Sequence, residues 1–271
     1  MIKIIPRDKI KHLEWQAGQE MPVVNPVTNP TLQNTGGFNT DNSNCSFLEG
    51  DFGKTVLEEY NQLVQSEYQN ISSLRKLSFA DNVAKGSNPF SFVLLNRVLQ
   101  NHGRWVARPA DLERALENGA IDLSGTYGDS GLVLRTENNP NEYLAKNLAS
   151  QVKGKGYNVG GDTVMIPLAG LEISYDSSSP YDLIFQLTDS SEIIYAPQLN
   201  KTNHGKKFNG ADDKGLPAFE NNGSRTLYSN EENGICRLCR YRVHDLVARI
   251  DDLTISFSDG RVIVCAEGTS K

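Results

Sequence analysis

Hydrophobic residues recur at helical spacing through the first part of the chain. This spacing predicts helices over 54–69 and 141–152, each with one apolar face. A denser apolar run predicts a buried helix over 90–99. A proline at the first helical position and a glycine after the last predict a short helix over 109–118. The first part of the chain is therefore expected to supply helices.

Strand-like patterns occupy the second part of the chain. Segments rich in Val, Ile, Leu, Phe and Tyr predict strands over 163–174 and 183–196, the second as a hairpin that turns at 188–191. The polar, glycine-rich segment 200–224 predicts a loop. Apolar and polar residues alternate around an Asp-Gly turn signal at 253–265, and this pattern predicts another hairpin.

Composition narrows the fold class. The chain has 271 residues, a net charge of -6 and an apolar fraction of 38%, with many Gly, Asn and Ser residues. This length buries a sizeable core, and this composition favours a loop-rich α+β domain over a helical bundle. The segment 20–50 is polar and rich in Asn, Thr, Pro and Gly. We therefore expect an N-terminal arm over 1–50 and a single domain over 51–271.

Charge and hydropathy argue against nucleic-acid binding, a membrane span and a signal peptide. The acidic balance argues against nucleic acid, because phosphate binding needs a clustered basic face. The chain has no run of about 18 apolar residues, so no membrane span is expected. Its start lacks the long apolar region and cleavage site of a signal peptide. The expected location is cytoplasmic by default, unless the protein is exported or carried on a virion.

Cysteine and histidine spacing predicts no catalytic residue, metal site or cofactor. Four cysteines are too few for a disulfide scaffold of this size. Cys236 and Cys239 form a CxxC pair, but a structural zinc site needs four ligands, and Cys45 and Cys265 are single and distant. We interpret the pair as two free cysteines on a loop. The four histidines, at 12, 102, 204 and 244, show no metal-binding spacing. The chain also has no Gly-x-Ser-x-Gly motif, the nucleophile elbow of many hydrolases.

The segment 233–265 has an unusual composition. It contains no Lys, Glu, Gln, Met or Trp, although about six such residues would be expected there from the composition of the preceding chain. Arg, Tyr and His lie beside Val and Ile, a mixture typical of an exposed contact surface. The alternative interpretation of the same residues is a core hairpin preceded by a polar loop.

The five absent residue types share a property of the genetic code. Randomising the two adenines of an Asn codon of the form AA-pyrimidine gives fifteen residue types. That set excludes Lys, Glu, Gln, Met and Trp, as well as a stop. Three of the four cysteines fall in 233–265, an enrichment that mutation without a packing purpose would produce. The restricted alphabet therefore fits randomisation of the adenines in such codons.

Two sets of motifs carry a family resemblance. The C-terminal set is Gly-Ser-Arg-Thr-Leu-Tyr at 223–228, Gly234, Arg237-Leu238, Asp251-Asp-Leu253, Ser256, Asp259-Gly-Arg-Val262 and Ala266-Glu-Gly268. The upstream set is Trp-Val-Ala-Arg-Pro-Ala-Asp-Leu at 105–112, Gly-Leu-Val-Leu-Arg at 131–135, Ile-Pro-Leu-Ala-Gly-Leu at 166–171 and Ile-Tyr-Ala-Pro-Gln at 194–198. These motifs resemble the variable (target) proteins of diversity-generating retroelements, especially archaeal ones, in which an error-prone reverse transcriptase rewrites adenine positions. The resemblance covers roughly 80–271, with the variable region at about 229–265.

The resemblance implies a C-type lectin fold of the formylglycine-generating-enzyme-like branch. Such a domain has mixed or antiparallel strands, two or more packing helices and long loops, and it holds varied side chains on a ligand-binding surface. The chain lacks the paired active-site cysteines of the catalytic branch, so the resemblance does not imply sulfatase-activating chemistry. It also gives no support for calcium-dependent sugar binding.

The resemblance also divides the variable region into scaffold and diversified positions. The positions expected to be scaffold are Gly234, Arg237, Leu238, Leu246, Ala248, Asp251, Asp252, Leu253, Ser256, Gly260, Arg261 and Val262. The positions expected to be diversified and ligand-binding are Cys236, Cys239, Arg240, Tyr241, Arg242, Val243, His244, Val247, Ile250, Ile255 and Phe257.

The expected function is therefore a non-enzymatic display protein for a macromolecular ligand, a protein on another cell or a virus. Tyr241, Arg240 and Arg242 are expected as anchors, because aromatic residues and arginine dominate binding hot spots. Two alternatives stay open. One is an enzyme that uses Cys236, Cys239 or His244, and the other is a small zinc-binding interaction module.

Overall fold

The computed structural model describes residues 43–160, 163–229, 233–241 and 245–267, and these form an α+β fold. Most of the predicted N-terminal arm lies outside the described residues. The segment Ser43–Phe47 nevertheless forms strand β1, which pairs with a strand near the C-terminus. The folded part therefore begins before residue 51.

The four predicted helices are confirmed, each to within a few residues. They are α1 (Gly50–Glu67), α2 (Pro89–Gln100), α3 (Pro109–Glu117) and α4 (Glu142–Gly154). Helix α2 begins where the side chain of Asn88 accepts a hydrogen bond from the backbone N–H of Ser91. Ten of its twelve residues are buried, as the dense apolar run predicted. Short 3-10 helices follow elsewhere: η3 (Ser72–Arg75), η4 (Leu168–Gly170), η5 (Pro197–Leu199) and η6 (Lys201–Asn203).

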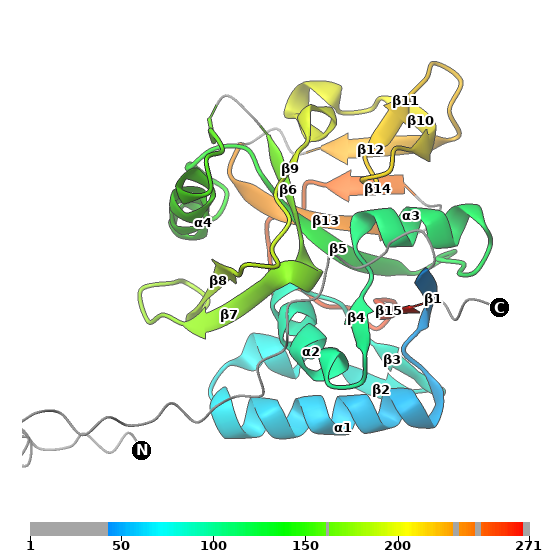
Figure 1. Cartoon of the computed structure of the whole chain (residues 1–271), viewed down its shortest axis with the longest axis vertical. Helices are drawn as coiled ribbons and strands as arrows, with labels where there is room; N and C mark the ends of the chain where they lie inside the picture. The colour runs from blue at the N-terminus through cyan, green and yellow to red at the C-terminus, as the bar shows by residue number, and fades with distance from the viewer. Residues whose placement is uncertain (1–42, 161–162, 230–232, 242–244, 268–271) are drawn as a thin grey trace, which may run out of the picture. The chain divides into compact units, whose positions relative to one another are not determined.

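An eight-stranded mixed sheet forms the centre of the fold (Figure 1). Its strand order is β11-β10-β12-β14-β13-β5-β6-β9, in which β12 and β14 are parallel and the other pairs are antiparallel. The strands are β5 (Tyr127–Leu134), β6 (Val164–Pro167), β9 (Ile194–Tyr195), β10 (Lys207–Ala211), β11 (Pro217–Phe219), β12 (Arg225–Ser229), β13 (Ile235–Tyr241) and β14 (Asp245–Ala248). Strands β13 and β14, from the predicted variable region, are thus inner strands.

Three smaller sheets complete the described part of the fold. They are β1-β15-β4, β2-β3 and β7-β8. Their remaining strands are β2 (Ser78–Ala80), β3 (Val83–Lys85), β4 (Arg104–Val106), β7 (Leu171–Tyr175), β8 (Leu183–Leu187) and β15 (Ile263–Glu267). A disulfide joins Cys45 of β1 to Cys265 of β15, across 220 positions of sequence. Treating these two cysteines as single and distant was therefore wrong.

Three predictions about strands and loops were also wrong. The 253–265 segment is not a hairpin, because only its last residues enter β15, which pairs with β1 and β4. The 183–196 segment is not a hairpin either, since β8 pairs with β7 and β9 pairs with β6. The 200–224 segment is not entirely loop, because it contributes β10 and β11.

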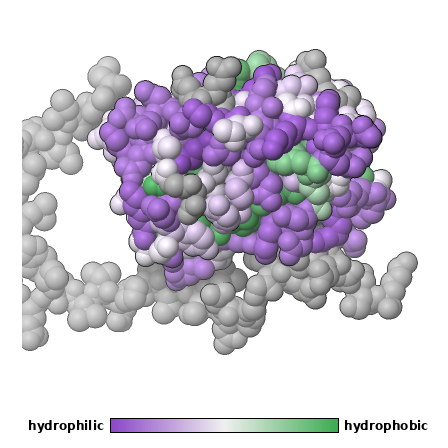
Figure 2. Space-filling model, turned by 90° about the horizontal axis from the view of Figure 1, so that it is seen from above, coloured by the Kyte–Doolittle hydropathy of each residue, from purple (hydrophilic) through white to green (hydrophobic). Residues whose placement is uncertain are grey.

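The main hydrophobic core lies between helices α1, α2 and α4 and the strands that they cover. Phe90 of α2 stacks on Phe185 of β8 with ring centroids 4.5 Å apart. A second core packs Leu238 of β13 against residues of β5, β6, β10, β12 and β14. Hydrophilic residues cover most of the face shown in Figure 2, and hydrophobic residues appear there in small patches. No helix among the described residues is long and apolar enough to cross a membrane.

Candidate functional site

The predicted variable region folds as two inner strands followed by a loop. Strand β13 pairs antiparallel with β14, with Tyr241 opposite Asp245. Residues 249–262, here called the 249–262 loop, then return along β13. The backbone N–H of Arg237 donates to the carbonyl of Ile250 at 2.9 Å, and its guanidinium donates to the carbonyl of Ile255 at 2.7 Å. The loop is therefore attached to β13 by its own backbone.

A buried ion pair holds this attachment. The Nε of Arg237 donates to Asp129 of β5 at 2.8 Å, and Nη2 donates to the other carboxylate oxygen and to the carbonyl of Ser87. The side chains of Arg237 and Asp129 are 1% and 0% exposed. Burial lowers the pKa of Arg237, but the charge and hydrogen bonds of Asp129 outweigh burial and raise that pKa overall. The guanidinium therefore stays charged beneath the loop.

Tyr127 and Ser87 fix the far part of the loop. The hydroxyl of Tyr127 donates to the carbonyl of Ser87 and accepts from the backbone N–H of Phe257 at 2.9 Å. The backbone N–H of Ser87 donates to the hydroxyl of Ser256, also at 2.9 Å. Gly260 lies so close to the preceding chain that a Cβ there would come within 2.7 Å of backbone atoms. All of these contacts leave the side chain of Phe257 unused, and it is 57% exposed.

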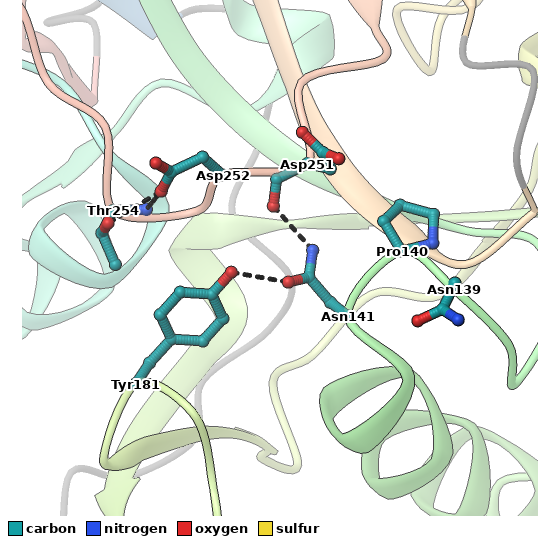
Figure 3. A pocket seen from close by; sticks show the side chains of 7 residues that line it. All are labelled: Asn139, Pro140, Asn141, Tyr181, Asp251, Asp252 and Thr254. Carbon is teal, nitrogen blue, oxygen red and sulfur yellow. Dashed lines mark hydrogen bonds between the residues drawn. The ribbon is translucent and has the colours of Figure 1, made fainter.

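A polar cavity of about 560 Å³ adjoins the start of the loop (Figure 3). Asn141 links its walls, since its amide donates to the carbonyls of Ile235 and Asp251 and accepts from the hydroxyl of Tyr181. Figure 3 shows the carboxylates of Asp251 and Asp252 pointing away from each other. They therefore do not form a convergent acid–base pair. The lining residues are Asn139, Pro140, Asn141, Tyr181, Asp251, Asp252 and Thr254.

The structure places four of the predicted ligand-binding side chains at the surface. Phe257 is exposed, and Tyr241, Ile250 and Ile255 are half-buried. The ring centroids of Tyr241 and Tyr127 lie 6.2 Å apart, so the same buried tyrosine contacts the ring of Tyr241 and the backbone of Phe257. Three further predicted positions lie outside the described residues; they are Arg242, Val243 and His244.

The expectation of an exposed contact is wrong for the other four predicted positions, Cys236, Cys239, Arg240 and Val247. Their exposed fractions are 5% or less. The physical reason is the strand order, because β13 and β14 have neighbouring strands on both sides and packed residues on both faces. Arg240 is therefore not available as a binding anchor in this conformation.

The CxxC cysteines are free, as predicted, but they lie in β13 and not on a loop. Burial raises the pKa of both thiols well above the ordinary value. Cys236 contacts a guanidinium nitrogen of Arg135 at 3.3 Å, which opposes the shift without reversing it. A nucleophilic cysteine needs a lowered pKa and an exposed sulfur, so these two thiols lack both features. Within the described ranges, no group of three His, Cys, Asp or Glu side chains is arranged to hold a metal ion.

A second buried charge cluster, which sequence patterns gave no means of finding, lies beneath the β13–β14 pair. Arg240 forms an ion pair with Glu113 of α3, and Arg225 of β12 donates to the same carboxylate at 2.8 Å. Both partners of the Arg240–Glu113 pair are buried. Burial lowers the pKa of Arg240 to about 9, and the nearby charge of Asp245 opposes this shift. Glu113 could have been noted only as one polar residue of a predicted helix.

Comparison with known proteins returned no relative. No family model matches the chain, and no curated protein or solved structure matches it. The α+β class follows from the structure itself. The likeness to retroelement target proteins rests on the sequence motifs alone.

Proposed function

We propose that the chain is a ligand-binding display protein with a C-type lectin-like fold, whose C-terminal region is diversified by adenine-directed mutagenesis of a retroelement. One observation carries this proposal. Two buried side chains hold the backbone of the 249–262 loop: Arg237, an expected scaffold position, and Tyr127 of β5. The side chains of Ile250, Ile255 and Phe257 are left free of those contacts. A fixed backbone that presents exchangeable side chains is the arrangement that a diversified binding surface needs.

Several scaffold positions support the proposal because their structural tasks restrict which residue can stand there. At Gly234, a Cβ would lie 2.0 Å from the carbonyl oxygen of Pro140. Asp252 accepts from the backbone N–H groups of Thr254 and Ile255 and so forms the turn of the loop. Eight of the expected scaffold residues are buried, namely Gly234, Arg237, Leu238, Leu246, Ala248, Leu253, Gly260 and Val262.

Affinity would come from a small number of anchors at the surface. Aromatic side chains dominate hot spots, and Tyr127 contacts the ring of one such residue, Tyr241, and the backbone of another, Phe257. The backbone of Phe257 is already ordered by Tyr127 and by a hydrogen bond from Gly260, so binding costs little additional ordering. The proposed partner is a macromolecule, a protein on another cell or a virus, and catalysis is not required. Arg240 has no place among these anchors.

Two matched libraries test this proposal. The contact library randomises positions 241, 250, 255 and 257 with the residue set that adenine mutation of Asn codons allows. The framework library randomises positions 237, 238, 246 and 253 with the same codons. Folding is scored by protease resistance on a display particle, and both libraries are then selected against one soluble protein, such as streptavidin.

We expect most members of the contact library to stay folded and to yield binders. Members of the framework library should lose folding, because a randomised buried position leaves cavities or unpaired polar groups. Equal loss of folding in the two libraries would contradict the division between scaffold and displayed side chains. A well-folded contact library that yields no binder would contradict the display function itself.

A further inference from the structure

The ion pair of Arg240 and Glu113 connects a predicted diversified position to a helix outside the variable region. Both side chains are nearly inaccessible, at 2% and 3% exposed. Arg240 also lies over the ring of Phe208, with its guanidinium carbon 5.6 Å from the ring centroid. Arg240 is therefore enclosed by α3 and β10, and it cannot reach a ligand from this position.

Arg240 is also adjacent to the part of the hairpin that carries a proposed anchor. It lies opposite Leu246 in the β13–β14 register, and the next pair is Tyr241 with Asp245. Asp245 accepts a hydrogen bond from the backbone N–H of Thr226 in β12 at 2.6 Å. The last residues of β13 and the first of β14 thus lie between β5 and β12 in the sheet, and the ion pair of Arg240 with Glu113 adds an attachment to α3.

We infer that Arg240 is a positioning residue: its buried ion pair with Glu113 fixes the end of the β13–β14 hairpin, and residue 240 therefore shapes the binding surface without touching the ligand. This inference rests on the proposed function only for the statement that the surface binds. Diversification at position 240 would alter the orientation of Tyr241, while diversification at position 257 would exchange a contact directly.

Glu113 makes this inference separable from general destabilisation. Arg225 donates to the same carboxylate, so removal of Arg240 leaves Glu113 with one ion-pair partner. The attachment of α3 to β12 is then retained, and no uncompensated carboxylate is left buried by the change. Loss of Arg240 is therefore expected to loosen the hairpin end more than the rest of the fold.

Hydrogen–deuterium exchange of the full-length protein tests the inference. The variant Arg240→Met keeps most of the side-chain volume and removes the ion pair. Arg240→Lys keeps the charge and serves as the conservative variant. The matched control is Arg97→Met, which breaks the exposed pair of Arg97 with Glu67. Exchange is followed in peptides from β13 and β14 and, for reference, in α4 and β7–β8.

We expect Arg240→Met to raise exchange in the β13–β14 peptides about tenfold, since a hydrogen bond to a charged group is lost locally, and to leave α4 and β7–β8 unchanged. Arg240→Lys should restore part of the protection, and Arg97→Met should leave β13–β14 unchanged. Unchanged β13–β14 exchange in Arg240→Met would overturn the inference. So would an equal rise in every peptide, or failure of both Arg240 variants to fold, because either result shows a general structural role.

The two proposals fail in different experiments. The exchange measurement uses no ligand, so a negative result in the library selection leaves it valid. Binders from the contact library supply a second readout. When Arg240→Met is placed in a selected binder, affinity for streptavidin should fall at least about tenfold although residue 240 is buried. Unchanged affinity in a folded variant would overturn the positioning role while leaving the display function in place.

Discussion

The substitution Asp129→Asn removes the charge that balances the buried guanidinium of Arg237. Asp129 accepts two hydrogen bonds from Arg237 and a third from the hydroxyl of Ser87. The asparagine is nearly the same size, so the change creates no cavity. It leaves Arg237 with the carbonyls of Ser87 and Ile255 as its acceptors, together with one amide oxygen. The measured decrease in the free energy of unfolding should therefore come from the loss of the ion pair.

Removing one partner of a buried ion pair typically lowers the free energy of unfolding by about 3–5 kcal/mol. Because Arg237 keeps two carbonyl acceptors, we expect a loss near the lower value, about 3 kcal/mol. A matched exposed pair gives the contrast. The side chains of Arg97 and Glu67 are 56% and 43% exposed, and Glu67→Gln should cost less than about 1 kcal/mol. The double variant Asp129→Asn/Arg237→Met removes the stranded charge and should recover about 1 kcal/mol or more relative to Asp129→Asn.

Urea unfolding followed by circular dichroism measures these free energies, and exchange of the 249–262 loop shows where the loss occurs. The Asp129 variant should release the loop before the rest of the fold, because Arg237 attaches Ile250 and Ile255 to β13. A cost no larger than that of Glu67→Gln would refute the reasoning. A double variant less stable than Asp129→Asn would refute the part that depends on charge.

Three further predictions concern the cysteines and the exposed ring. Replacing Cys45 and Cys265 by Ser should lower the free energy of unfolding by about 5 kcal/mol, because the disulfide restricts the unfolded chain across a separation of 220 residues. Equal urea midpoints with and without the disulfide would contradict this. Phe257→Ala should change the free energy of unfolding by less than about 0.5 kcal/mol, because the ring is exposed, and it should abolish binding in a selected binder that retains Phe257; a cost above about 2 kcal/mol would show a packing role. Cys236 and Cys239 should react with a thiol reagent at pH 8 only after unfolding, and prompt reaction in the folded protein would contradict their burial. Burial raises the pKa of both thiols, so the free energy of unfolding should fall as pH rises above the ordinary thiol pKa of 9.0, where the thiols of the unfolded chain ionise first.

The helices were predictable because their signals are local. Helix α2 combines a dense apolar run with Asn88 as cap and Pro89 at the first position, and all three features lie within a few residues. The disulfide of Cys45 and Cys265 depends instead on two strands brought together from opposite ends of the described chain. No spacing rule links such positions.

The 249–262 loop shows why alternation alone misled. Leu253 and Phe257 would lie on the same face of a strand, yet Leu253 is buried in the main core and Phe257 is exposed. The carbonyl of Ile255 accepts a hydrogen bond from Arg237 and not from a neighbouring strand. The carboxylate of Asp252 accepts from the backbone N–H of Thr254 and so forms a turn. Tertiary contacts therefore override a pattern of period two.

The candidate site was predictable in its scaffold and less so in its contacts. The residue types at Gly234, Arg237 and Gly260 match tasks that the structure assigns to them. The burial of Arg240 could not be read from the sequence, because a buried arginine requires a partner, and Glu113 lies far earlier in the chain. Charged residues in a polar stretch are ordinarily exposed, and here the partner from α3 reverses that expectation.

Sequencing the DNA that flanks the gene tests the proposed function most directly. We expect a near-copy of the segment that encodes about 229–265, adjacent to a reverse-transcriptase gene. The copy should differ from the gene only where it carries adenine, and it should encode Asn at the diversified positions, including 240, 241, 255 and 257. It should match the gene at the scaffold codons, such as those of Gly234, Arg237 and Gly260. A locus without such a copy, or a copy whose differences fall on scaffold codons, would contradict the proposal.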